Sequence, residues 1–151
     1  MYLNDGTGSK LDYYMRTGTS ATWCADGTAG FRLTLRNDAP DPAMLPEEVT
    51  GGGAYGVPVG RTLSGVYIVL PPGARVESRQ ATGSGGASGF VGGDDRGRGV
   101  LTRSVLLAPG ESATLDLRIA TPPTVGLEVV STPRLYATEI PVDGAPCANE
   151  G

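Results

Sequence analysis

One segment constrains the fold of this chain more than any other: an apolar run stops at Pro109-Gly110, and strict alternation follows it. Beyond that break, Leu115, Leu117 and Ile119 lie on one side of the pattern, with polar residues between them. Successive side chains of a strand point to opposite faces, so this alternation is typical of a half-buried antiparallel strand. Pro-Gly marks the turn that precedes it. The segment therefore predicts a β-sandwich.

Similar runs recur along the chain, and no amphipathic helical pattern persists for three turns. The predicted strands span residues 10–17, 28–36, 63–70, 74–80, 99–107, 112–119, 125–130 and 134–140, with a further two-residue extended segment at 90–91. About seven or eight short strands separated by turn signals indicate an all-β, antiparallel, immunoglobulin-like β-sandwich. A chain of 151 residues can bury a core as one unit, so we predict a single domain over residues 1–151.

The first two predicted strands have the clearest faces. The side chains expected to share a face are Leu11, Tyr13 and Met15 in residues 10–17, and Phe31, Leu33 and Leu35 in residues 28–36. Asp26-Gly27 lies between the two strands and is a strong hairpin signal. We also expect Trp23 to pack on its neighbour Cys24.

A long connection, residues 37–60, separates the second predicted strand from the third. It is much longer than a connection needs to be, and loops of this length are usually functional or held by their own packing. Residues 51–56 within it match G-x-G-x-x-G. A dinucleotide-binding fingerprint needs a strand before the glycines and a helix after them, and neither is predicted here. We interpret the match as a glycine-rich loop.

Charge excludes several classes of partner. The net charge is −4 and the arginines are scattered, so the chain lacks the basic patch that neutralises phosphates. Nucleic acids and anionic membrane surfaces are therefore not expected as partners. The sequence has no run of about 18 apolar residues and no recognisable signal peptide.

The sequence contains few candidate catalytic or metal-binding residues. The chain has no histidine, which removes Ser-His and Cys-His nucleophiles and the commonest metal ligand. Paired carboxylates could support glycoside hydrolysis, and Glu47-Glu48 and Asp94-Asp95 are the adjacent pairs. Carboxylates that are neighbours in sequence are, however, typical of solvated loops. We predict a protein that is not an enzyme and has no cofactor, with a carboxylate-based hydrolase as the less favoured alternative.

A turn at residues 4–9 has oxygen-bearing side chains at alternate positions, Asp5, Thr7 and Ser9, as a cation site would. Asp94 and Asp95 could add charge to it. The turn lacks the D-x-[DN]-x-[DN]-G pattern and the terminal glutamate of an EF-hand loop. We therefore predict a structural turn and no metal site.

Cys24 and Cys147 are the only cysteines. Two unrelated thiols in a reducing compartment are the alternative to a disulfide, but no apolar pattern around Cys147 would bury a free thiol. A disulfide between them would close almost the whole domain and stabilise it strongly. The pairing favours an oxidising, extracytoplasmic location.

Tyrosines are the aromatic residues from which a ligand site could be built. Tyr55 lies in the glycine-rich loop, where its ring could stack on a sugar, and Tyr14 is one of two adjacent tyrosines, so one of the pair must face outward. Asp94 and Asp95 lie at a predicted hairpin tip. We take these four residues as the candidate ligand-binding residues, with core packing as the alternative for the tyrosines.

Two segments together resemble a known family. Residues 2–15 and 49–60, with residues 24–27 and 33–40 between them in order, resemble the C-terminal region of an actinobacterial envelope family catalogued as domain of unknown function 4012. The resemblance covers about the first 75 residues. It implies a longer protein, anchored through an upstream membrane helix, of which this chain is an extracytoplasmic part. It implies no activity and no catalytic residues.

The residues and the resemblance together predict a non-enzymatic, extracytoplasmic module of a cell envelope, with a structural or interaction role. The expected partner is a cell-wall glycan or another envelope protein. A carbohydrate-binding module for wall polysaccharide is the main alternative, and it requires an aromatic ring that is exposed beside polar groups.

Overall fold

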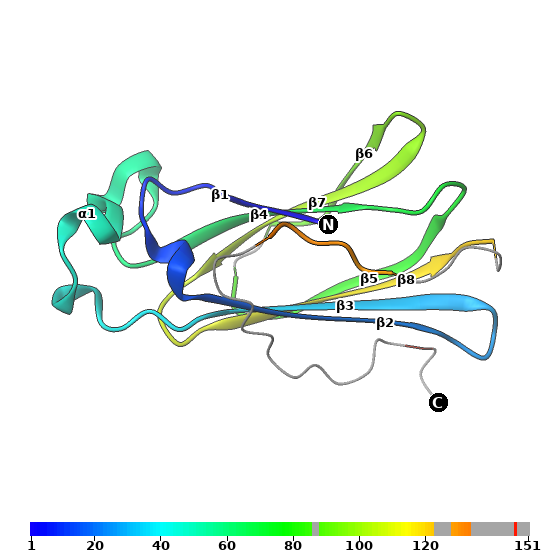
Figure 1. The fold of residues 1–151 in the computed structure, drawn as a ribbon, viewed down its shortest axis with the longest axis horizontal. Coiled ribbons are helices and arrows are strands. Elements are labelled where there is room, and N and C mark those ends of the chain that lie inside the picture. Colours follow the sequence, from blue (N-terminus) through cyan, green and yellow to red (C-terminus); the bar gives the residue numbers. More distant parts are fainter. Residues whose placement is uncertain (86–87, 123–127, 134–146, 148–151) are drawn as a thin grey trace.

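The computed structural model describes residues 1–85, 88–122, 128–133 and 147. Within these residues the chain forms two antiparallel sheets of four strands, stacked face to face (Figure 1). The strands are β1 (Tyr2–Asp5), β2 (Met15–Trp23), β3 (Thr28–Asn37), β4 (Thr62–Val69), β5 (Arg75–Gly83), β6 (Val91–Asp95), β7 (Arg98–Leu107) and β8 (Ser112–Ala120). The predicted all-β sandwich is confirmed.

The first sheet has the strand order β1-β4-β7-β6 and the second has the order β2-β3-β8-β5. Hairpins join β2 to β3 and β6 to β7. Central pairs join strands far apart in the sequence, since β3 pairs with β8 and β4 pairs with β7. The pairing of β3 with β8 sets Leu33 opposite Leu115, so the two most strongly alternating segments share one face.

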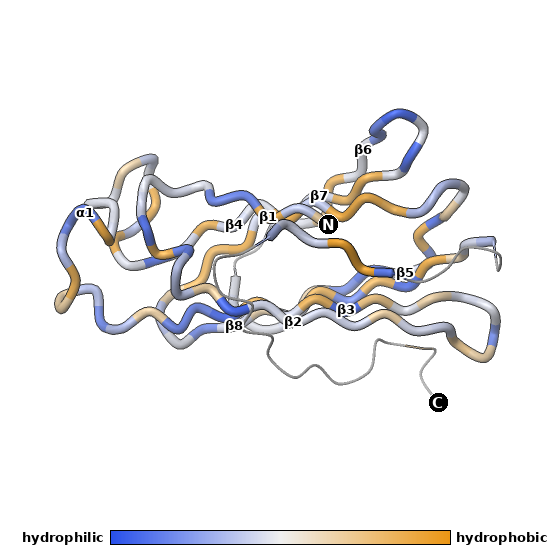
Figure 2. The backbone as a smooth tube through the Cα atoms, in the orientation of Figure 1, coloured by the Kyte–Doolittle hydropathy of each residue, from blue (hydrophilic) through white to orange (hydrophobic). Residues whose placement is uncertain are grey.

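The core fills the space between the sheets. Phe31, Leu33 and Leu35 of β3 are buried, as predicted from the alternation, and Leu115 and Leu117 of β8 lie against the same interior. The other sheet contributes buried side chains from β4 and β7, namely Val66, Ile68, Leu101, Val105 and Leu107. Figure 2 shows the hydrophilic colour gathered at turns such as the tip between β6 and β7.

The first predicted strand, residues 10–17, is wrong over its first half. Leu11–Tyr14 forms a 3-10 turn, η1, and the strand begins only at Met15 and continues to Trp23. Met15 is paired with Asn37, the last residue of β3, so residues before Met15 have no partner strand left to join. Leu11 is buried all the same, within η1.

Two other elements differ from the prediction. Strand β1 was not predicted, because it has no alternating pattern and depends on pairing with β4. Residues 128–130, the described part of a predicted strand over residues 125–130, form no strand. Instead they run beside β1, where the Met1 ammonium donates to the carbonyl oxygen of Val130 at 2.6 Å and Val129 packs against the core. Residues 125–127 and the predicted strand 134–140 lie outside the described residues.

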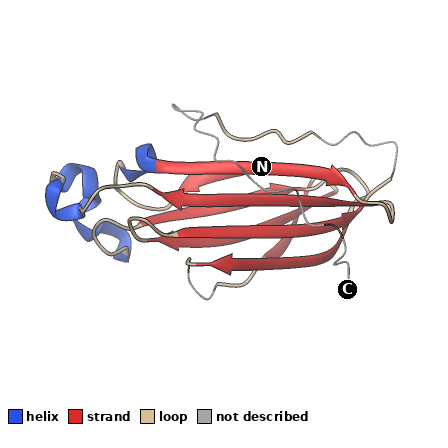
Figure 3. Cartoon of the chain, turned by 90° about the horizontal axis from the view of Figure 1, so that it is seen from below, coloured by secondary structure: helices blue, strands red, loops and turns tan. Residues whose placement is uncertain are grey.

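Four short helical elements gather at one end of the sandwich (Figure 3). They are η1 and three elements of the long connection: η2 (Pro42–Met44), α1 (Glu47–Thr50) and η3 (Gly51–Gly56). We call this the helical end. None of the described helices has the length and the apolar character needed to span a bilayer.

Candidate functional site

The long connection is a compact, structured loop that starts at a buried polar anchor. The side chain of Asn37 is fully buried, its Nδ2 donates to the carbonyl oxygen of Leu107 at 3.2 Å, and its Oδ1 accepts from the backbone N–H of Ala39 at 2.9 Å. Next, Asp41 accepts from the N–H of Ala43 at 2.9 Å and so caps η2. The connection is therefore held by its own packing, one of the two outcomes predicted for it.

Asp38, next to this anchor, binds two arginines. Arg36 donates to both of its carboxylate oxygens, at 2.6 and 2.9 Å, and Arg16 lies 3.5 Å from it. The hydrogen bond from Arg36 is the main reason that the pKa of Asp38 is lowered. A carboxyl group whose pKa is lower in the folded state stabilises the fold above its usual pKa, and this contribution is lost as the pH falls through the lowered value.

We therefore expect Asp38→Asn to lower the free energy of unfolding at pH 7 by no more than about 1 kcal/mol, because the pair is partly exposed. The difference from the wild type should shrink as the pH is lowered from 7 to 2, because protonation of the wild-type carboxylate removes its advantage over the amide. Urea unfolding of both chains at the two pH values measures it. An equal difference at both pH values would show that charge is not the cause.

Tyr55 projects from the helical end in an unusual conformation. Its φ is +58°, in the left-handed region that L side chains adopt at a cost of about 1 kcal/mol or more, and 83% of its surface is exposed. The ring lies against Gly8, because a Cβ at that glycine would lie 2.9 Å from Tyr55 Cε2. A strained, exposed aromatic side chain on a structured loop marks a candidate contact site.

The glycines beside Tyr55 let the loop turn tightly against the turn at residues 4–9. Gly51, Gly52 and Gly53 all have positive φ. A Cβ at Gly51 would lie 3.0 Å from the backbone nitrogen of Ser9, so the two segments touch there. The G-x-G-x-x-G match therefore forms successive left-handed turns, as the interpretation of a glycine-rich loop requires.

The turn at residues 4–9 binds its own hydroxyl and amide groups. The Asp5 carboxylate accepts from the N–H of Thr7 at 2.8 Å and from its hydroxyl at 2.6 Å, and the Thr7 and Ser9 hydroxyls lie 2.6 Å apart. In the described part of the chain no three His, Cys, Asp or Glu residues cluster as metal ligands would. The geometry agrees with a structural turn.

Asp94 and Asp95 lie far from that turn. Asp5 pairs with Ser64 at the start of β4, whereas Asp94 pairs with Gly99 beyond the other end of the strand. The separation is about 20 Å along the sheet, at about 3.4 Å for each residue. The hairpin tip accordingly lies away from the helical end (Figure 1). The four candidate ligand residues therefore do not form one site.

Tyr14 is closer to the connection. Its carbonyl oxygen accepts from the N–H of Asp38 at 3.1 Å, and its ring meets the Tyr13 ring edge to face, with the centroids 5.1 Å apart. Tyr13 is the exposed member of the pair and Tyr14 is half-buried. Tyr14 therefore packs against the neighbouring Tyr13 ring, and a role for it in ligand binding stays a prediction.

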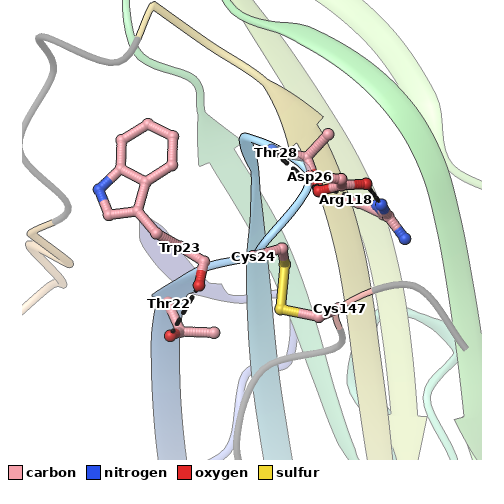
Figure 4. Close-up of a disulfide and its surroundings, with 7 residues drawn as sticks. All are labelled: Thr22, Trp23, Cys24, Asp26, Thr28, Arg118 and Cys147. Carbon is pink, nitrogen blue, oxygen red and sulfur yellow. Dashed lines mark hydrogen bonds and ion pairs between the residues drawn. A yellow bond between two sulfur atoms is a disulfide. The ribbon is translucent and has the colours of Figure 1, made fainter. Parts of the chain in front are cut away.

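Cys24 and Cys147 form a disulfide, with the sulfur atoms 2.09 Å apart and the Cα atoms 5.3 Å apart. The predicted pairing is thus present in the structure (Figure 4). Trp23 does not pack on it as expected: Figure 4 shows the indole pointing away from the sulfur atoms. Trp23 pairs with the core-facing Ala29, and side chains of successive residues diverge.

A cleft of about 710 Å³ opens between the sheets, at the end opposite the helical end. Its apolar lining comes from both sheets and from residues 128–133, and includes Phe31, Ile68, Leu70, Leu117 and Val129. Asp95, Arg98 and Glu128 are its charged lining residues. Of the predicted carboxylate pairs only Asp95 reaches it. Its volume is in the range of small-molecule sites.

Sequence reasoning missed two exposed tyrosines on the outer face of the sheet β1-β4-β7-β6. Tyr67 lies between Val66 and Ile68, both buried, so alternation alone assigns its ring to the outside. Tyr2 had no such signal, because β1 was not predicted. No sequence signal predicted the cleft either, because the cleft arises where the two sheets diverge.

Comparison with known proteins adds no relative from which a function could be transferred. No family model, no curated protein and no solved structure matches this chain.

Proposed function

We propose that this chain is a non-enzymatic binding module that works outside the cytoplasm, and that the loop around Tyr55 is its contact surface. As the sequence resemblance implies, we assign it to an actinobacterial cell envelope. The partner is a wall glycan or another envelope protein. The observation that carries this proposal is the exposed, left-handed Tyr55 at the tip of a structured loop.

The disulfide supports the location. A bond between Cys24 and Cys147 persists in oxidising surroundings and is rare in the cytoplasm. Both cysteines of the chain are used in it. Titrating the thiols of the unfolded, unreduced protein tests this part of the proposal: we expect no reactive thiol, and two reactive thiols would contradict it.

Backbone strain supports the contact surface. A glycine or asparagine at position 55 would adopt the same backbone at lower cost, and the exposed ring buries little surface in return. Strain of this kind clusters at functional sites, where side-chain chemistry outweighs stability. The absence of histidine from the chain supports binding over nucleophilic catalysis.

The test is retention of the full, oxidised chain on an insoluble actinobacterial envelope fraction. We expect the wild type and Tyr55→Phe to be retained, and Tyr55→Asn to be retained at least tenfold less. Asn removes the ring but tolerates positive φ, so Tyr55→Asn should be as stable as the wild type or more so in urea unfolding.

Treating the envelope fraction with protease separates the two classes of partner. Loss of retention after this treatment identifies a protein partner, whereas unchanged retention identifies a glycan. A wild type that is not retained, or a Tyr55→Asn variant retained as well as the wild type, contradicts the proposed contact surface.

A further inference from the structure

The outer face of the sheet β1-β4-β7-β6 carries two exposed tyrosines side by side. Tyr2 and Tyr67 are directly paired across β1 and β4, with 60% and 41% of their surfaces exposed. Residues that are paired on one face have their Cβ atoms about 5 Å apart. The two phenol side chains therefore start from neighbouring positions on this face.

Gly65 provides the space into which the Tyr67 ring leans. A Cβ at Gly65 would lie 3.2 Å from Tyr67 Cε2 and 3.7 Å from the hydroxyl oxygen. The ring therefore leans along β4 over Gly65 and occupies the volume that a side chain there would fill. An aromatic side chain that leans along a sheet presents more of its surface to a ligand than one that stands upright.

Uncharged polar groups surround the two rings. Across the sheet, Asn4 and Ser104 flank Gly65, and Thr102 is paired with Tyr67. Strand β4 contains no charged residue, and the outward positions of β7 from Val100 to Leu106 contain none either. The aliphatic side chains of this face, such as Leu63 and Leu106, are only partly exposed. The exposed groups are therefore mainly phenol rings, hydroxyls and an amide.

We propose that this face, which we call the tyrosine face, binds an uncharged glycan chain. A sugar ring has an apolar face that stacks on an aromatic ring and hydroxyl groups that hydrogen-bond to the Asn4, Thr102 and Ser104 side chains. The uncharged positions around the two rings match a neutral ligand, and the nearest charged residues in the same outward rows, Arg98 and Asp95, are cross-strand partners of opposite charge beyond Val100. This inference deepens the proposed function, on which it rests, by naming the class of partner and a second binding surface.

A protein partner fits the tyrosine face less well. Stable protein interfaces bury about 800 Å² on each side around a well-packed apolar centre. On the tyrosine face the aliphatic side chains are already partly buried. Apart from Val91, polar residues separate the two exposed rings from other exposed apolar groups.

The experiment titrates the full, oxidised chain with soluble neutral oligosaccharides of glucose, mannose, galactose and xylose, using calorimetry. We expect one of the four series to bind. Tyr67→Ala and Tyr2→Ala should each weaken that binding at least tenfold, which corresponds to about 1.4 kcal/mol, whereas Tyr67→Phe should keep most of it. Gly65→Ala should also weaken binding, because the added methyl group displaces the ring.

Two controls test whether a loss of glycan binding is specific to the tyrosine face. Tyr13→Ala removes an exposed tyrosine at the helical end and should leave glycan binding unchanged. Urea unfolding should show Tyr67→Ala folded and within about 1 kcal/mol of the wild type, since the ring is on the surface.

Several outcomes would overturn the inference. These are no binding of the wild type to any of the four series, equal binding by Tyr67→Ala, or self-association of the chain that Tyr67→Ala abolishes. The last would assign the tyrosine face to a second copy of the chain. Envelope retention that depends on Tyr55, found together with no glycan binding, would leave the proposed function standing and refute this inference alone.

Discussion

Replacing both cysteines with serine should lower the free energy of unfolding by about 4 to 5 kcal/mol, the largest effect that we expect from any change in this chain. The disulfide joins residues 123 positions apart. In the chain-entropy model, a cross-link that closes a loop on the order of a hundred residues removes this much freedom from the unfolded state. A domain of this size has a total stability of only about 5 to 15 kcal/mol. The double variant Cys24→Ser/Cys147→Ser should therefore be marginally stable.

Urea unfolding of the oxidised wild type, the reduced wild type and the double variant measures the effect. The reduced wild type and the double variant should unfold at similar urea concentrations, both well below the oxidised protein. Reductant should not change the double variant, which controls for other effects of the reagent. Equal midpoints for the oxidised and reduced wild type would contradict both the stabilising role of the bond and the argument from it to an oxidising location.

Side-chain hydrogen bonds and an ion pair hold the hairpin turn beside Cys24. Asp26 accepts hydrogen bonds from the N–H and the hydroxyl of Thr28, at 3.1 and 2.7 Å, and is paired with the Arg118 guanidinium of β8 (Figure 4). Cys147 is thus tied to a turn that is itself fixed to a central strand.

The fold was predictable where the local pattern and the tertiary partner agree. The alternation in β3 and β8 is strong, and each strand finds the other across a fully paired register. The prediction of a strand failed at Leu11, where the sequence alternation continues although the partner strand β3 has already ended. Strand β1 was not predictable from local sequence, since only its pairing with β4 makes it a strand.

The candidate site was only partly predictable, for a related reason. Loop length and composition identified the connection and Tyr55, but the left-handed backbone of Tyr55 could not be read from composition. The pairing of Tyr2 with Tyr67 is a matter of register between distant strands. Asp94 lies in β6 and Tyr55 lies in η3, toward opposite ends of the sandwich, and composition alone carries no information on this separation.

Replacing the buried anchor of the connection, by Asn37→Ala, should lower the free energy of unfolding by about 3 kcal/mol. The change leaves the Ala39 N–H without its acceptor and removes a donor from the Leu107 carbonyl oxygen, and each buried group left unsatisfied costs about 1 to 3 kcal/mol. The Thr62 hydroxyl, 3.5 Å from that same oxygen, compensates only in part. Urea unfolding measures the loss, and Asn4→Ala, the same substitution at an exposed strand position, should change stability by less than about 0.5 kcal/mol.

Asn37→Asp separates lost hydrogen bonds from lost volume. It keeps the shape of the side chain but directs a carboxylate oxygen at the Leu107 carbonyl, and burial raises the pKa of such a group. Its deficit relative to the wild type should therefore shrink as the pH falls, because the protonated form can donate to that carbonyl. The deficit of Asn37→Ala should stay constant over the same pH range. If Asn37→Asp is as stable as the wild type at pH 7, the polar anchor does not hold the start of the connection, and the helical end must be held by the contacts of Gly51 and Tyr55 with the turn at residues 4–9.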